Sequence, residues 1–251
     1  MSPNCNTYFA SVAMSCLMAV VAPTANATLL LSGSVNATNF CASDQNVGCG
    51  FGGVIPDGNP AVNELGLNFV VINGVQVFGS LHIATYGPPQ NVLNSSSLQI
   101  INTNNFAVDI LVAVSATDFV PPSTTAFTSG SGTFQDVGGS TIDLLWWNDP
   151  ANQQGGEDPN DTPGVLLDSF SFVAPTAPLS FAHNGGPFAV LDLLPYSMTL
   201  QFHFTLPAGG ELVSRGQTVN KDVVQIPEPA SLLLFGTGLS LLVWRFRKVS
   251  V

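Results

Sequence analysis

Residues 196–206 alternate strictly between apolar and polar side chains, and this pattern constrains the fold more than any other feature of the chain. The apolar positions are Tyr196, Met198, Leu200, Phe202, Phe204 and Leu206, with polar residues at every position between them. Because successive side chains of a β-strand point to opposite faces, a period of two predicts a strand with one buried face and one solvated face. Residues 106–114 alternate similarly, beginning at Phe106, but Leu111 faces the other side, which leaves open a strand that is buried on both faces.

A β-hairpin is expected over residues 69–78. Asn73-Gly74 separates two apolar runs there, and this dipeptide supplies the positive φ angles of a type I′ turn. Further strands are expected at residues 98–101, 141–147 and 166–173. Antiparallel strands with one apolar face bury that face by stacking two sheets. We therefore predict an all-β fold, an antiparallel β-sandwich over residues 28–225, with helices only in the two flanking ends.

The charge balance excludes one large class of function. Charged residues make up only 8% of the chain, and 16 acidic residues against 5 basic ones give a formal net charge of -11. A protein that binds nucleic acid needs clustered cations to displace counterions from phosphate groups, so we exclude a nucleic-acid partner. Within residues 28–225 only Arg215 and Lys221 are basic, which disfavours contact with acidic polymers unless divalent cations bridge them.

Residues 1–27 have the features of a secretory signal peptide. A mostly apolar run, ASVAMSCLMAVVA, ends at a proline, and Ala25 and Ala27 put small residues at the positions that signal peptidase recognises. We therefore expect cleavage before Thr28 and export of the remainder. The first nine residues lack the usual Lys or Arg, so either the free amine suffices or the protein starts upstream of Met1. The alternative interpretation is an apolar helix of the fold.

The C-terminal end carries the most specific pattern in the chain. Pro227-Glu228-Pro229 is followed by an uncharged apolar segment, ASLLLFGTGLSLLVW, and then by Arg245, Arg247 and Lys248. The apolar segment is short for a hydrocarbon core of about 30 Å, and it spans as a helix at about residues 230–246 if the basic side chains reach the headgroups. By the positive-inside rule, the basic tail stays in the cytoplasm and the body lies outside.

This arrangement resembles the PEP-CTERM sorting signal, which combines a Pro-Glu-Pro motif, one short apolar helix and a terminal basic cluster. The resemblance covers residues 226–251. It implies recognition by an exosortase, a transpeptidase-like membrane enzyme of Gram-negative bacteria, at an inner-membrane intermediate with the body outside and the C-terminus cytoplasmic. It further implies delivery to the cell surface or to an extracellular exopolysaccharide matrix. The alternative is an ordinary single-span membrane anchor.

Two cysteines remain once the signal peptide is removed, Cys41 and Cys49, in a segment rich in Gly and Asn. An exported chain most often pairs two such thiols, so we expect a structural disulfide. The Cys-x-x-Cys spacing that is typical of redox catalysis is absent.

An acidic loop over residues 149–161 offers oxygen ligands of the kind that calcium prefers. The candidate ligands are Asp149, Glu157, Asp158, Asn160 and Asp161. Asp158-x-Asn160 begins like an EF-hand loop, but Pro163 stands where that loop requires Gly. The sequence leaves two interpretations open, a calcium site and a solvated acidic turn, and it indicates no other cofactor.

Trp146 and Trp147 precede the acidic loop, and strand alternation puts their indoles on opposite faces. An exposed indole beside this loop could stack on a sugar ring. The alternative is that it covers the edge of the sandwich.

No catalytic constellation is recognisable in the sequence. His82, His183 and His203 lack the pairings of a zinc site, and Ser131 lacks the Gly-x-Ser-x-Gly spacing of a nucleophile elbow. We therefore expect a non-enzymatic, exported surface or extracellular-matrix protein. The alternative is a carbohydrate- or calcium-binding, adhesin-like β-sandwich on a plain C-terminal membrane anchor.

Overall fold

A computed structural model describes residues 29–46, 48–96 and 98–223. The expected signal peptide with Ala25, Ala27 and Thr28 lies outside these residues, as do Pro227-Glu228-Pro229, the apolar segment and the basic tail of Arg245, Arg247 and Lys248. Among the described residues, no helix is both long enough and apolar enough to span a membrane. The helical structure there is a short 3-10 turn, η1 (Asp44–Asn46).

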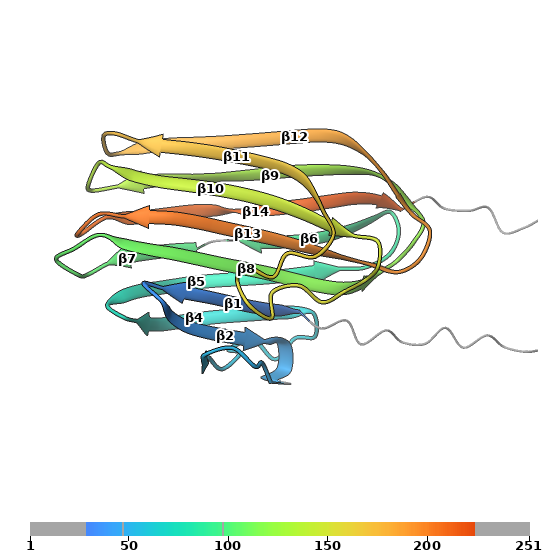
Figure 1. Ribbon diagram of the computed structural model, residues 1–251, viewed down its shortest axis with the longest axis horizontal. Coiled ribbons are helices and arrows are strands. Elements are labelled where there is room, and N and C mark those ends of the chain that lie inside the picture. The colour runs from blue at the N-terminus through green and yellow to red at the C-terminus, as the bar shows by residue number, and fades with distance from the viewer. Residues whose placement is uncertain (1–28, 47, 97, 224–251) are drawn as a thin grey trace, which may run out of the picture.

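Two β-sheets form the body, and their long strands overlie one another in Figure 1. Sheet A has the order β11 (Val165–Ala174), β10 (Ser140–Asp149), β13 (Tyr196–Leu206), β8 (Val108–Phe119), β1 (Leu30–Val35), β2 (Thr38–Ser43), β3 (Gly53–Val54). Sheet B has the order β12 (Leu179–Asp192), β9 (Ser123–Gln135), β14 (Glu211–Val223), β6 (Gln90–Ser96), β5 (Val75–Thr85), β4 (Glu64–Ile72), and β7 (Leu98–Asn102) pairs with β14 and β5. Among these paired strands, only β2 and β3 run parallel. The predicted antiparallel β-sandwich is confirmed.

The alternating segment forms β13 with the predicted bounds. Its apolar side chains, such as Phe202 and Phe204, are buried in the core between the sheets. The prediction of one solvated face is only half right, because Ser197 and Thr199 are also buried. The loop that follows β10 covers this end of the strand, and only the polar residues nearer Leu206 are partly exposed.

The predicted hairpin joins β4 to β5. Asn73 and Gly74 have φ angles of 47° and 75°, and Ile72 pairs with Val75 across the turn, as a two-residue type I′ connection requires. The expected role of Phe106 is wrong. It lies in the loop before β8 and is 51% exposed, because the strand begins only at Val108.

Strand β9 has no clear apolar alternation in the sequence, because small residues occupy its inward positions before Phe134. A Cβ at Gly130 would lie 2.6 Å from Cδ1 of Leu144, and one at Gly132 would lie 2.8 Å from the ring of Phe181. Large side chains of neighbouring strands fill the space that these glycines leave. The burial of this part of β9 therefore depends on large side chains of other strands, which the sequence of β9 does not reveal.

Candidate functional site

The acidic loop, predicted at residues 149–161, begins at the last residue of β10 and lies within the connection to β11. This connection, residues 150–164, folds back over the outer face of sheet A, and Figure 1 shows it in yellow crossing the strands. The backbone N–H of Gly155 donates to Oγ of Ser115 at 3.2 Å, and Oγ of Ser197 donates to the carbonyl of Gln153 at 2.6 Å. These bonds fix the loop backbone to β8 and β13. The loop is therefore a covering layer of the sheet rather than a free solvated turn.

Asp149, the first of the predicted calcium ligands, is bonded to the backbone of the loop. It is buried, and its two oxygens accept the backbone N–H groups of Ala151 and Gln153 at 3.0 and 2.8 Å. A carboxylate that accepts backbone amides in this way stabilises the start of the loop. Asp149 thus has a structural role in the loop, and its role as a calcium ligand stays a prediction.

The remaining predicted ligands lie further along the loop. Oδ1 of Asp158 accepts the backbone N–H of Asn160 at 2.7 Å, which forms a tight turn. Burial raises the pKa of the Asp161 carboxyl, and the negative charges of Glu157 and Asp158 raise it further. Within the described ranges, no three His, Cys, Asp or Glu side chains are grouped closely enough to hold a metal ion. Calcium binding therefore stays a prediction.

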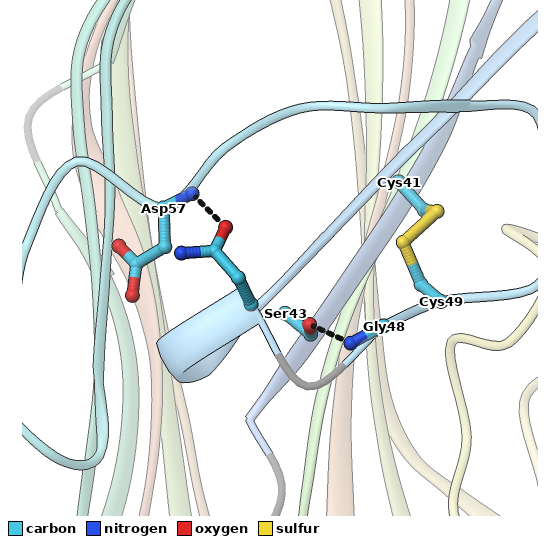
Figure 2. Close-up of a disulfide and its surroundings, with 6 residues drawn as sticks. Cys41, Ser43, Gly48, Cys49 and Asp57 are labelled. Atoms are coloured by element: carbon cyan, nitrogen blue, oxygen red, sulfur yellow. Dashed lines mark hydrogen bonds between the residues drawn. A yellow bond between two sulfur atoms is a disulfide. The ribbon is translucent and has the colours of Figure 1, made fainter.

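The predicted disulfide is confirmed. Figure 2 shows Cys41 bonded to Cys49. Cys41 lies on β2 and Cys49 in the loop after η1, and their Cα atoms are 6.1 Å apart. Oγ of Ser43 accepts the backbone N–H of Gly48 at 3.1 Å beside the bridge. Hydrogen bonds of 2.8 and 3.0 Å between Asp57 and the residues of η1 fix the opposite side of this loop. These contacts hold the described residues of the disulfide loop, 44–46 and 48–57, at the edge of sheet A.

A cavity of about 690 Å³ lies between the disulfide loop and the acidic loop. Its walls combine an aromatic ring, two carboxylates, two amides and a hydroxyl. These side chains belong to Phe51, Asp118, Glu157, Asn152, Gln154 and Thr117. The cavity is within the size range of small-molecule sites, and its lining can both stack on a ring and form hydrogen bonds. Two segments that the sequence singled out separately therefore meet at one place.

Asp118 and Asn152 organise one wall of this cavity. The backbone N–H of Asp118 donates to Oδ1 of Asn152 at 2.8 Å, and Nδ2 of Asn152 donates to Oδ1 of Asp118 at 2.7 Å. Both residues have positive φ, 62° and 58°. Backbone strain of this kind is often found at functional sites. Sequence reasoning missed both residues, because a single Asp at the end of an apolar strand carries no recognisable signal.

The two tryptophans lie on opposite faces, as predicted. Trp146 is fully buried in the core and its Nε1 donates to the carbonyl of Thr218 at 3.0 Å, so its expected role in sugar stacking is wrong. Trp147 lies on the outer face of β10, between Leu166 and Thr199 of the neighbouring strands, and is half-buried. Sugar stacking by Trp147 stays a prediction, and this residue does not line the cavity beside the disulfide.

His203 lies on the outer face of β13, as predicted. Its Nε2 is 2.9 Å from Oδ1 of Asp109, and its Nδ1 is 3.7 Å from Oδ2 of Asp143. These groups line an open groove of about 540 Å³ together with Phe170. The carboxylates are about half exposed, so they form a solvated polar surface rather than a desolvated catalytic site.

The body ends where the C-terminal pattern begins. Strand β14 ends at Val223. Residues 225–248 match the family model described as the PEP-CTERM protein-sorting motif. The chain carries a PEP-CTERM sorting motif. The predicted resemblance of this C-terminal segment to the PEP-CTERM sorting signal is thereby confirmed.

Solved structures resemble the sandwich body of this chain only distantly. TmCBM61 in complex with β-1,4-galactotriose is 8% identical, with 59% of this chain and 88% of that chain covered and a TM-score of 0.33. Endoglucanase 3 of Trichoderma harzianum is 12% identical, with 61% and 100% covered and a TM-score of 0.22. Scores this low support no inference about ligand or activity. A comparison with curated proteins found no match.

Proposed function

We propose that the chain is exported, held at the inner membrane by its C-terminal segment and processed there by an exosortase. The observation that carries this proposal is the match of residues 225–248 to the sorting motif. The motif begins two residues after Val223, where the last strand of the sandwich ends. The sandwich is thus attached to the recognised segment by its final strand. Pro227 and Pro229 lack backbone donors and disfavour helix, so we expect the motif to be extended and accessible to the enzyme.

The sandwich itself acts as a non-enzymatic module at the cell surface or in an exopolysaccharide matrix. A His–Asp–Thr contact exists at the edge of the sandwich, but its order is not that of a catalytic triad. His183 Nε2 lies 2.7 Å from Oδ2 of Asp168, and Oγ1 of Thr128 donates to the same oxygen. In a triad the histidine lies between the hydroxyl and the carboxylate. This arrangement ties β12 and β9 to β11 and supports a structural role.

The sorting proposal is tested with Glu228→Ala in a host that has an exosortase and in the matched deletion strain. We expect wild type to lose residues 230–251 only where the exosortase is present, and Glu228→Ala to remain full-length in the inner membrane. Glu211→Ala, which removes an acidic residue of the body, is the control and should be processed like wild type. Equal processing of wild type and Glu228→Ala in both strains contradicts the proposal and leaves a plain membrane anchor.

A second candidate function is binding of a carbohydrate in the cavity between the two loops. The observation that favours it is the lining, in which Phe51 lies among carboxylates, amides and a hydroxyl. Sugar rings stack on aromatic faces and exchange hydrogen bonds with such groups.

Retention on immobilised exopolysaccharide should fall for Phe51→Ala. It should be unchanged for Phe106→Ala, which removes a half-exposed ring elsewhere. Equal retention of the two variants contradicts this function.

A further inference from the structure

A lysine, an asparagine and an aspartate meet inside one end of the sandwich. Lys221 lies on β14 of sheet B, Asn148 on β10 of sheet A, and Asp192 at the end of β12 of sheet B. Their exposed fractions are 0%, 5% and 2%. A charged side chain is almost never fully buried unless it is paired, so this cluster needs a physical explanation.

The contacts among the three side chains form a closed triangle. Nζ of Lys221 donates to Oδ1 of Asn148 and, at 2.5 Å, to Oδ2 of Asp192. Nδ2 of Asn148 donates to the other carboxylate oxygen, Oδ1 of Asp192, at 3.1 Å. The carboxylate therefore bridges an amine and an amide nitrogen, while the amine touches the amide carbonyl.

The surroundings of the triangle are aromatic and exclude water. Nζ of Lys221 lies 3.9 Å from the centroid of the Tyr196 ring, which stacks on Phe119. The hydroxyl of Tyr196 accepts a hydrogen bond of 2.6 Å from Asn91 and closes the far side. Burial lowers the pKa of Lys221 to about 8, although Asp192 opposes this shift. A larger fraction of this lysine is therefore neutral and nucleophilic near neutral pH than of an exposed lysine.

We propose that Lys221 and Asn148 form an intramolecular isopeptide bond, with Asp192 as the proton-transfer group. The carboxylate of Asp192 takes a proton from the Lys221 ammonium, and the neutral Nζ attacks Cγ of Asn148. Asp192 then gives a proton to Nδ2 of Asn148 and accepts the second proton of Nζ. The Nζ–Cγ bond forms, the Cγ–Nδ2 bond breaks, and ammonia leaves and takes up the remaining proton as ammonium. The reaction needs no oxidant and no further reactant.

The folded structure supplies what this reaction needs. Side chains held in contact behave as if at very high concentration, which replaces an improbable encounter by a unimolecular step. A carboxyl group between the attacking and leaving nitrogens is the arrangement for general acid–base catalysis. The product is a neutral amide, whose remaining N–H can donate to the Asp192 carboxylate in place of the ammonium.

The bond would give the sorting substrate a mechanical role beyond its sorting. It joins sheet A to sheet B, and Lys221 lies only two residues before Val223, where the sandwich leads into the sorting motif. Tension applied through the C-terminal attachment would therefore reach a covalent link before it could peel β14 from β9 and β6. A surface protein held by its C-terminus gains resistance to shear in this way.

The test is the intact mass of the folded, full-length or processed protein, with its termini defined by peptide mapping and its disulfide reduced. We expect wild type to be lighter than its sequence by one ammonia molecule, and proteolysis to yield a branched peptide that joins Lys221 to Asn148. Asp192→Asn and Lys221→Met should have the mass of their sequences. Asp222→Asn, which changes a carboxylate on the neighbouring residue of β14, should still lose ammonia.

The wild-type mass decides the proposal even if a core variant fails to fold. Folded wild type at the full mass of its sequence overturns it and leaves a structural ion pair. Loss of one water molecule instead of ammonia also overturns it, because that mass places the bond between Lys221 and Asp192.

Discussion

Asp118 and Asn152 hold each other through two reciprocal hydrogen bonds, of 2.8 and 2.7 Å, that join the end of β8 to the acidic loop. Both residues line the cavity between the disulfide loop and the acidic loop. The conformation of the acidic loop and the shape of the cavity therefore depend on one side-chain pair.

Asn152→Asp should remove the hydrogen bond from Nδ2 of residue 152 to Asp118 while keeping a side chain of the same shape. The variant keeps a residue that tolerates positive φ, but it replaces the Nδ2 donor with a second carboxylate facing Asp118. We expect a loss of about 1–3 kcal/mol in the free energy of unfolding at neutral pH, measured by chemical denaturation. Gln153→Glu adds the same charge at an exposed position of the loop and should cost much less. Equal effects of the two variants would show that the pair is unimportant.

Calcium should raise the melting temperature if the acidic loop binds it, because a ligand of the native state stabilises that state by mass action. The mutual repulsion of Glu157, Asp158 and Asp161, which helps to raise the pKa of Asp161, is what a cation would relieve. Asp158→Ala combined with Asp161→Ala should remove the shift. An unchanged melting temperature of wild type in millimolar calcium contradicts the metal prediction.

The sequence predicted best where side-chain chemistry reports directly on backbone geometry. The period of two located β13, and Asn73-Gly74 located the β4–β5 turn, because each signal arises within one segment. Strand β9 escaped detection because its inward glycines make sense only beside Leu144 and Phe181, which come from other strands. The burial of Ser197 and Thr199 depends likewise on a distant loop that folds over them.

The buried triangle shows which signal was missed. Asn148 continues the inward series of Leu144 and Trp146 on β10, and Lys221 follows Val219 at the next inward position of β14. A polar residue at an inward position of an alternating strand indicates a buried partner. The identity of that partner could not be read from the sequence, because strand order across two sheets decides which side chains meet.

The acid sensitivity of the fold should depend on His82. This residue lies on β5 and is 2% exposed, and burial lowers its pKa from 6.5 to about 3. Below pH 6.5 the unfolded chain therefore binds a proton that the native protein does not bind. The contribution of His82 to the free energy of unfolding then falls as the pH drops from 6.5 toward 3, by about 1.4 kcal/mol for each pH unit once the unfolded histidine is protonated.

His82→Gln should reduce this slope, because glutamine cannot take up a proton in either state. Burial raises the pKa values of Asp44 and Asp161, and protonation of these carboxyls stabilises the native state in the acid range. They oppose the effect of His82 equally in wild type and variant, so the difference in slope between the two proteins reports on His82 alone. Chemical denaturation at several pH values between 4 and 7 measures it. His203→Gln, on the exposed outer face, is the matched control. If wild type and His82→Gln lose stability in parallel over this range, His82 is not the group that makes the fold sensitive to acid.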